Sequence, residues 1–198
     1  MLLLKRRVGE SIVIGGSIRV SVVEVRGGSV RLAIDAPGEL AVYRAELLEK
    51  LGEENARALT PEVQGERDMA DPVITFPQGI PGMGSHTVFQ LFDLDAGHRA
   101  LVARDDPTLC LLIVDPLLVD PNYPVERAFS RYPFEREELA VAVVLTRSLD
   151  DSPPTVNMAA PIVIGVSSRK AAQIFLEDEH LSLRTPLVPP PQAEAHAP

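Results

Sequence analysis

Three consecutive basic residues near the amino terminus, Lys5, Arg6 and Arg7, form the densest positive cluster of the sequence. In an extended strand, Leu4 and Arg6 would point to one side and the other two basic side chains to the opposite side. A guanidinium beside a short apolar platform suits single-stranded RNA, whose exposed bases need stacking area and hydrogen-bond donors. Arg44 would supply a second guanidinium. The alternative interpretation of the triplet is a charged face that contacts only solvent.

Residue types that serve catalysis are scattered along the chain. The only cysteine, Cys110, lies in an apolar run, which indicates a buried, inert thiol rather than a nucleophile. The sequence has neither a phosphate-binding loop that ends in Gly-Lys-Ser/Thr nor a Gly-x-Ser-x-Gly elbow. The four histidines lie far apart, without metal-ligand spacing: His86, His98, His180 and His196. We therefore predict no enzyme activity, no metal site and no cofactor.

Composition is that of an ordinary globular protein, with 45% hydrophobic and 24% charged residues in a chain of 198. No apolar run approaches the roughly 18 residues that a membrane span needs. We predict a cytoplasmic protein with no membrane partner. The net charge of −9 is unevenly distributed, because residues 1–59 carry +1 and residues 60–198 carry −10. A mildly basic module is thus joined to a strongly acidic one.

The first 58 residues alternate short apolar runs with glycine-containing turns, which predicts strands joined by hairpins. Helical periodicity then predicts a helix over Arg44–Leu59, although Gly52 could end it one turn early. Five strands and one helix bury little apolar surface and leave open edges, so we expect this module to form a dimer that shares strands. The predicted strands are Leu2–Arg7, Ser11–Ile14, Ser17–Val25, Ser29–Asp35 and Glu39–Tyr43.

From about residue 60 onward, short branched runs separated by turn clusters predict a second, mostly antiparallel β domain, a sandwich or a barrel. The Pro-rich segment 188–198 predicts a disordered tail. The predicted strands are Val73–Phe76, Val88–Leu91, Leu109–Val114, Leu139–Thr146, Pro161–Val166 and Ala171–Leu176.

Four motifs of the first module run in order and resemble the carbon storage regulator CsrA (also called RsmA): Met1–Glu10, Ile14-Gly15, Val30–Pro37 and Val42–Arg44. The resemblance implies a homodimer with interleaved strands that binds GGA-containing hairpin loops in messenger leaders and controls translation. Its RNA surface combines the first strand of one protomer with the last strand and helix start of the other. The residues that carry over are Leu4, Arg6, Arg7, Val42 and Arg44.

Four motifs of the second module resemble the flagellar assembly factor FliW: Phe76–Met83, Leu111–Pro116, Thr155–Ile164 and Ser182–Leu187. The resemblance implies a β-rich, non-catalytic protein that binds CsrA, blocks its RNA binding, and binds flagellin instead when flagellin accumulates. Residues 53–58 resemble the helix extension by which CsrA docks on FliW, with Asn55 as the candidate docking residue. The alternative for Asn55 is a solvated helix face.

The two resemblances divide the chain into a CsrA-like domain (1–58), a linker with the first edge strand (59–72), a FliW-like domain (73–187) and the tail. A short tether gives the second domain an effective concentration of roughly millimolar. Our leading hypothesis is a self-inhibited, flagellin-responsive RNA regulator. One alternative is a flagellin-binding assembly factor or chaperone whose CsrA-like half serves only for dimerisation. Another is docking in trans between chains.

Overall fold

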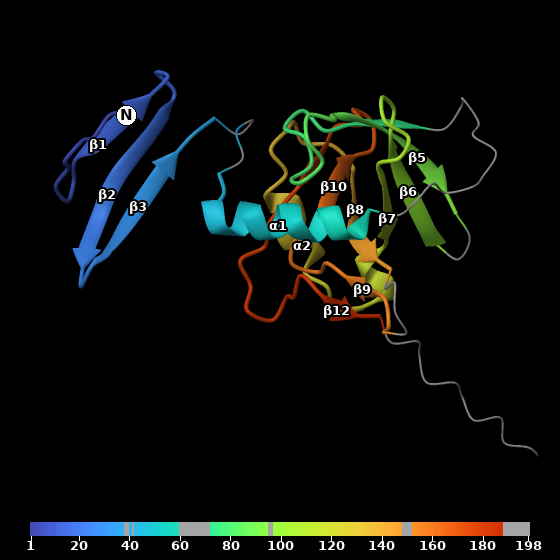
Figure 1. The fold of residues 1–198 in the computed structure, drawn as a ribbon. Helices are drawn as coiled ribbons and strands as arrows, with labels where there is room; N and C mark the ends of the chain where they lie inside the picture. The colour runs from blue at the N-terminus through green and yellow to red at the C-terminus, as the bar shows by residue number, and fades with distance from the viewer. Residues whose placement is uncertain (38–39, 41, 60–71, 95–96, 148–151, 188–198) are drawn as a thin grey trace, which may run out of the picture. The chain divides into compact units, whose positions relative to one another are not determined.

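The structure, a computed structural model, describes residues 1–37, 40, 42–59, 72–94, 97–147 and 152–187. They form two compact units, residues 1–42 and 43–198, each described by itself below. The described chain is mainly β with few helices, as the sequence predicts (Figure 1). Most of the predicted linker at 59–72 and all of the predicted tail at 188–198 lie outside the described residues.

The unit of residues 1–42 is a small antiparallel sheet in the order β1-β2-β3. Both connecting turns place two glycines, at 15–16 and 27–28, at positive φ between 50° and 85°. Those values are the left-handed conformations of a tight two-residue hairpin, so the glycine pairs predict both turns correctly. The strands are β1 (Ser11–Ile14), β2 (Ile18–Arg26) and β3 (Ser29–Asp35).

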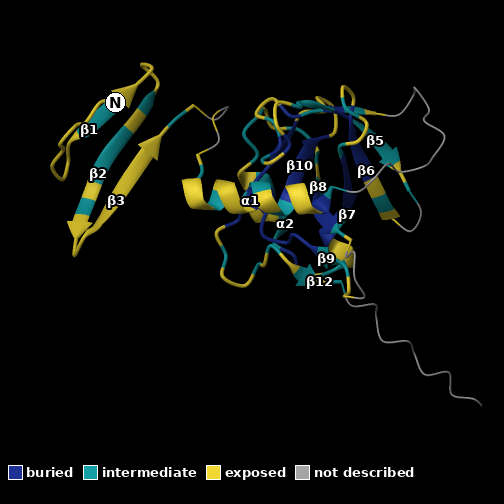
Figure 2. Cartoon of the chain, in the orientation of Figure 1, coloured by how far each residue is buried: buried dark blue, intermediate teal, exposed yellow. Residues whose placement is uncertain are grey.

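No described residue of this unit is buried, and Figure 2 draws its strands entirely in yellow and teal. Strand β3 is exposed along its whole length. Its alternating apolar residues Val30, Leu32 and Ile34 are 53%, 51% and 47% exposed. A three-stranded sheet with its apolar face this open has no core of its own.

Two of the five strands predicted for the first module are not formed in the single chain. Residues Leu2–Arg7 are in no strand, and the described part of Glu39–Tyr43 is in none either. Strand pairing requires backbone partners on a neighbouring strand, and the described residues of one chain provide none here.

The second unit is built on a long antiparallel path, β11-β10-β8-β7-β6-β5-β4. Its two ends are joined at Thr75, whose N–H donates to the Arg169 carbonyl at 2.8 Å beside a bridge to Lys170. The strands of the path are β4 (Val73–Thr75), β5 (Val88–Asp93), β6 (His98–Ala103), β7 (Cys110–Val114), β8 (Leu139–Thr146), β10 (Ile162–Gly165) and β11 (Ala171–Gln173).

The core of this unit lies on both faces of the sheet. Leu111 and Ile113 belong to one buried cluster, while Cys110 and Leu112 belong to the other. Every residue of β7 is therefore buried (Figure 2), which explains why its sequence is continuously apolar rather than alternating. The buried rings of Phe76 and Phe89 pack edge to face with centroids 5.3 Å apart.

Each of the six apolar runs predicted as strands in this unit overlaps an observed strand. The sequence prediction missed β6, because its apolar core Ala100–Val102 is short and begins after His98 and Arg99. It also missed a 3-10 helix at Pro116–Leu118, the short pair β9 (Thr155–Val156) and β12 (Thr185–Pro186), and helix α2 (Val125–Ser130).

Candidate regulatory interface on helix α1

Helix α1 spans Ala45–Ala58, close to the predicted range, and continues through Gly52. It belongs to the second unit, where it lies across β8 and β7 (Figure 1). Its buried residues Leu51, Asn55 and Ala58 recur at helical spacing and form a single face toward the sheet. Asn55 is the unusual residue of that face, because its side chain is polar and yet 0% exposed.

Gly52 is explained by a close backbone approach rather than by helix termination. A Cβ on Gly82, whose φ is +81°, would lie 2.2 Å from the Gly52 carbonyl oxygen. A Cβ on Gly52 would lie 3.3 Å from the Gly82 nitrogen. The helix therefore packs directly on the backbone of the turn that includes Pro81 and Gly82, and both contacting positions depend on a missing side chain.

Asn55 is held at this interface by a buried network of amides. Its Nδ2 donates to the Pro81 carbonyl at 2.7 Å and to Gln173 Oε1 at 2.6 Å. The Gln173 Nε2 donates in return to Asn55 Oδ1 at 3.2 Å and to the Ala160 carbonyl at 3.2 Å. Because buried amides are costly when unpaired, this reciprocal pair selects a specific partner for the helix.

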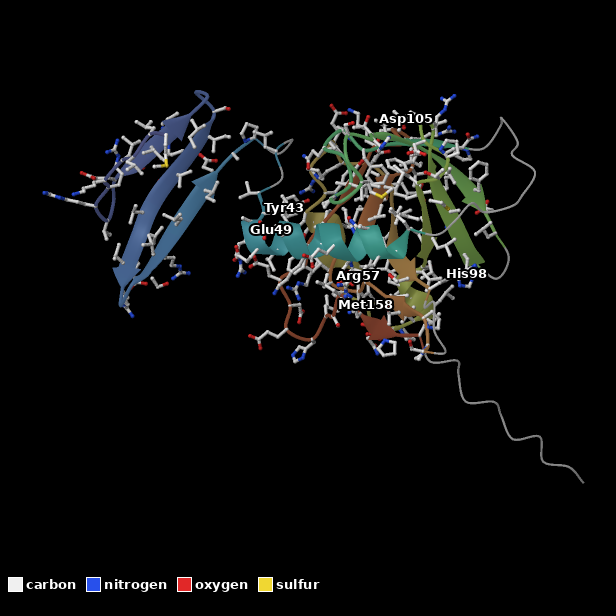
Figure 3. All side chains as sticks on the ribbon, viewed as in Figure 1. Tyr43, Glu49, Arg57, His98, Asp105 and Met158 are labelled. Carbon is white, nitrogen blue, oxygen red and sulfur yellow. The ribbon has the colours of Figure 1, made fainter. Side chains whose placement is uncertain are left out.

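The residues just before α1 are also held, by the last residue of β11 and by the segment that follows it. Tyr43 donates its hydroxyl proton to the Gln173 carbonyl at 2.6 Å, and burial raises the pKa of this phenol. Arg44 contacts Glu177 Oε1 through Nε at 3.2 Å and through Nη2 at 2.8 Å. Both side chains of this ion pair remain half exposed. Figure 3 labels Tyr43, which precedes α1, and Arg57, which lies in its last turn.

A second ion pair, between Glu54 and Arg184, connects the carboxyl-terminal half of helix α1 to the segment that precedes β12. Arg184 donates to both carboxylate oxygens of Glu54, at 2.7 Å from Nε and 2.5 Å from Nη2. The Glu54 side chain is only 13% exposed and is also 3.4 Å from Arg57. A forked contact of this kind fixes orientation as well as charge.

The other candidate RNA-binding residues belong to the unit of residues 1–42. Leu4 is 50% and Val42 is 54% exposed. Arg6 donates to the Ser11 carbonyl at 3.2 Å and to the Lys5 carbonyl at 2.9 Å, while the Arg7 N–H donates to Glu10 at 2.7 Å. These guanidiniums bind no acidic side chain in the described chain, unlike Arg44, which lies in the other unit.

Sequence reasoning named Asn55 and Arg44 but none of their partners in the second unit. Gln173 was the one detectable signal, because it is a polar residue inside the apolar run Ala171–Leu176. Gly82 and Arg184 carry no local signal, because a glycine in a turn and a surface arginine are ordinary. Glu177 is one of several acidic residues in its segment.

Comparison with known proteins accounts for both halves of the chain. The CsrA model, described as a global regulator protein family, matches residues 1–53, and the FliW protein model matches residues 59–187. A flagellar assembly factor FliW from Syntrophomonas wolfei is 31% identical over 130 residues, which cover 63% of this chain and 83% of that protein. A translational regulator CsrA from Nocardioides sp. is 52% identical over 61 residues, which cover 31% of this chain and 74% of that protein.

The chain belongs to both families, as a CsrA–FliW fusion. A crystal structure of the flagellar assembly factor FliW aligns with a TM-score of 0.55 at 26% identity, covering 66% of this chain and 96% of that one. Both families are named for regulation or assembly rather than for a reaction. Helix α1 begins inside the CsrA match and ends at Ala58, one residue before the FliW match starts.

Two properties of the described residues bear on other functions of the CsrA–FliW fusion. No three His, Cys, Asp or Glu side chains among them are grouped so as to hold a metal ion. Within the same ranges, no helix combines the length and apolarity needed to cross a membrane.

Proposed function

We propose that this chain is a post-transcriptional regulator that binds GGA-containing hairpin loops of messenger leaders, with its FliW domain as an antagonist in cis. The single observation that carries the proposal is the state of helix α1 and its flanks. Arg44, a candidate RNA-binding residue, is paired with Glu177 of the FliW domain. Asn55 of the same helix is buried against Pro81 and Gln173.

The openness of the first unit supports a homodimer in this proposal. None of its described residues is buried, and its apolar alternation needs a second surface to cover it. In the proposed dimer, residues Leu4, Arg6 and Arg7 of one protomer and residues Val42 and Arg44 of the other form each RNA site.

The short connection between the domains supports inhibition in cis. Leu59 and Pro72 bracket the linker, and tethering of this length gives an effective concentration of roughly millimolar. A docking equilibrium with micromolar affinity would then lie about a thousandfold toward the docked state. The relatives are called flagellar assembly factors, and in this proposal flagellin releases the helix by binding the FliW domain.

The test compares RNA binding by the full chain and by two full-chain variants, using a hairpin with a GGA loop. Asn55→Asp places a carboxylate beside the Pro81 carbonyl and Gln173 Oε1, two oxygens that accept hydrogen bonds from Asn55 Nδ2 in the wild type. Asn122→Asp adds the same charge at an exposed turn and is the matched control. We expect the first variant to bind RNA at least tenfold more tightly than wild type, and the control to bind no more tightly.

A gain of RNA affinity in Asn55→Asp is not a net-charge effect, because an added carboxylate disfavours RNA. Equal affinity of wild type and Asn55→Asp would defeat the self-inhibition proposal. Flagellin binding without RNA binding in all three proteins would favour the assembly-factor alternative, in which the CsrA domain only dimerises.

A further inference from the structure

Glu177 is presented to Arg44 from a backbone that is fixed on both sides. The preceding Leu176 is 1% exposed, and its N–H donates to the Ala159 carbonyl at 2.8 Å. The following Asp178 forms an ion pair with Arg127, which also donates to the Glu177 carbonyl at 3.3 Å. The Glu177 carboxylate is thus the free end of a segment held by buried packing and by α2.

Arg44 is fixed in the same way from its own side. The Tyr43 hydroxyl anchors the preceding residue to the Gln173 carbonyl at 2.6 Å. The Arg44 carbonyl accepts the N–H groups of Leu47 and Leu48 at 3.0 Å each in the first turn of α1. Because both backbones are held, only side-chain rotamers need to be ordered to make the pair, which lowers its entropic cost.

The contact has the chemistry of anion recognition by a guanidinium. Two nitrogens of Arg44, Nε and Nη2, converge on one carboxylate oxygen, and a guanidinium uses the same N–H donors to bind the oxygens of carboxylates and of phosphates. The Arg44 and Glu177 side chains are 59% and 50% exposed. An exposed pair of this kind is reversible and open to displacement by another anion.

From these contacts we infer that Glu177 is an intramolecular stand-in for an RNA phosphate: its carboxylate occupies the Arg44 guanidinium and competes directly with RNA. The inference rests on the proposed function and divides self-inhibition between two groups of residues. Asn55, Gly52 and their partners dock the helix, whereas Glu177 blocks the cation. Removing Glu177 therefore leaves the helix docked but frees Arg44.

The experiment measures RNA affinity of the full chain carrying Glu177→Gln or Glu179→Gln, at low and at high salt. The second variant is the matched control, because it removes one negative charge two residues away and shows no ion pair with a described residue. We expect Glu177→Gln to bind a GGA hairpin about two- to fivefold more tightly than Glu179→Gln, as an exposed ion pair implies. The ratio should fall toward one at high salt.

Two further measurements separate competition from a change in docking. Amide hydrogen exchange in α1 should be the same in wild type and Glu177→Gln, because the Asn55 network is intact. In an Asn55→Asp background, where the helix is released, Glu177→Gln and Glu179→Gln should bind RNA equally.

Each result decides between the two proposals. Equal RNA affinities of Glu177→Gln and Glu179→Gln in the otherwise wild-type chain would overturn the role of Glu177. If Asn55→Asp still tightens RNA binding in that case, the proposed self-inhibition stands without it. If neither Asn55→Asp nor Glu177→Gln tightens binding, both proposals fail.

Discussion

Substitution of Gly82 by alanine should release helix α1, because the helix backbone occupies the space of the missing side chain. The new Cβ would lie 2.2 Å from the Gly52 carbonyl oxygen, whereas real Cβ contacts stay above 3.0 Å. The two backbones must therefore separate by about 0.8 Å. Alanine at φ +81° adds strain of about 1–2 kcal/mol within the turn itself.

Separation of the Gly52 and Gly82 backbones should also disturb the hydrogen bonds of Asn55, which lies about one helical turn after Gly52. A shift of that size lengthens the 2.7 Å bond from Asn55 to the Pro81 carbonyl beyond the range of about 2.7–3.2 Å typical of N–H···O bonds. Each buried hydrogen bond contributes about 1 kcal/mol, and Leu51, 1% exposed, adds about 1–2 kcal/mol of partly lost burial. We expect docking to weaken by about 2–4 kcal/mol.

Gly79→Ala is the matched control for this prediction. Gly79 closes the preceding turn, where its N–H donates to the Phe76 carbonyl, and it has φ +71°, but its Cβ would meet only carbonyl oxygens at 3.9 Å. Both variants share the strain of a left-handed alanine, so their difference reports the contact with the helix.

Hydrogen exchange of α1 amides in the full chain measures the docking, and RNA titration measures its consequence. Gly82→Ala should lose protection in α1 and bind a GGA hairpin at least tenfold more tightly than Gly79→Ala. Equal α1 protection in the two variants would refute the packing argument.

Three further predictions concern stability and assembly. Burial raises the pKa of Tyr123, whose hydroxyl donates to the Met158 carbonyl. As pH rises, the phenol ionises first in the unfolded chain, so the free energy of unfolding should fall above about pH 10. Tyr123→Phe should reduce this fall, as measured by denaturant titrations at several pH values. Phe89→Ala, at a fully buried ring, should cost about 3–5 kcal/mol of unfolding free energy in the same titrations. Leu32→Lys on the apolar face of β3 should shift sedimentation from dimer to monomer, whereas Ala33→Lys on the opposite face should not; equal sedimentation would contradict the proposed dimer.

Local patterns were sufficient for most of the strands and for both families. The double glycines at 15–16 and 27–28 can adopt positive φ without steric cost, and here all four do, so they predict hairpins without tertiary information. The range of α1 followed from helical periodicity for the same reason. Strand β6 was missed because its burial depends on neighbours β5 and β7 that lie on either side of it in space.

The sequence predicted the residues of the candidate site on and beside helix α1 but not their partners in the rest of the second unit. Motif resemblance pointed to Arg44 and Asn55, because their roles follow from positions within short segments. Gln173, Glu177 and Arg184 lie about 118 to 133 residues away from their partners in the helix. No spacing rule connects residues that far apart, so only the folded chain brings them together.

The amino-acid sequence by itself determined the two modules, their charge asymmetry and the periodicity of each element, because these depend on neighbours along the chain. Tertiary structure alone decided what Gly52 does. Its position looked like a weak point of the helix, and the fold turns it into the site where two backbones meet at Gly82. The physical reason is that the role of a glycine depends on which atoms pack where its Cβ would otherwise be. Those atoms belong to a distant part of the chain, so the sequence around the glycine does not reveal them.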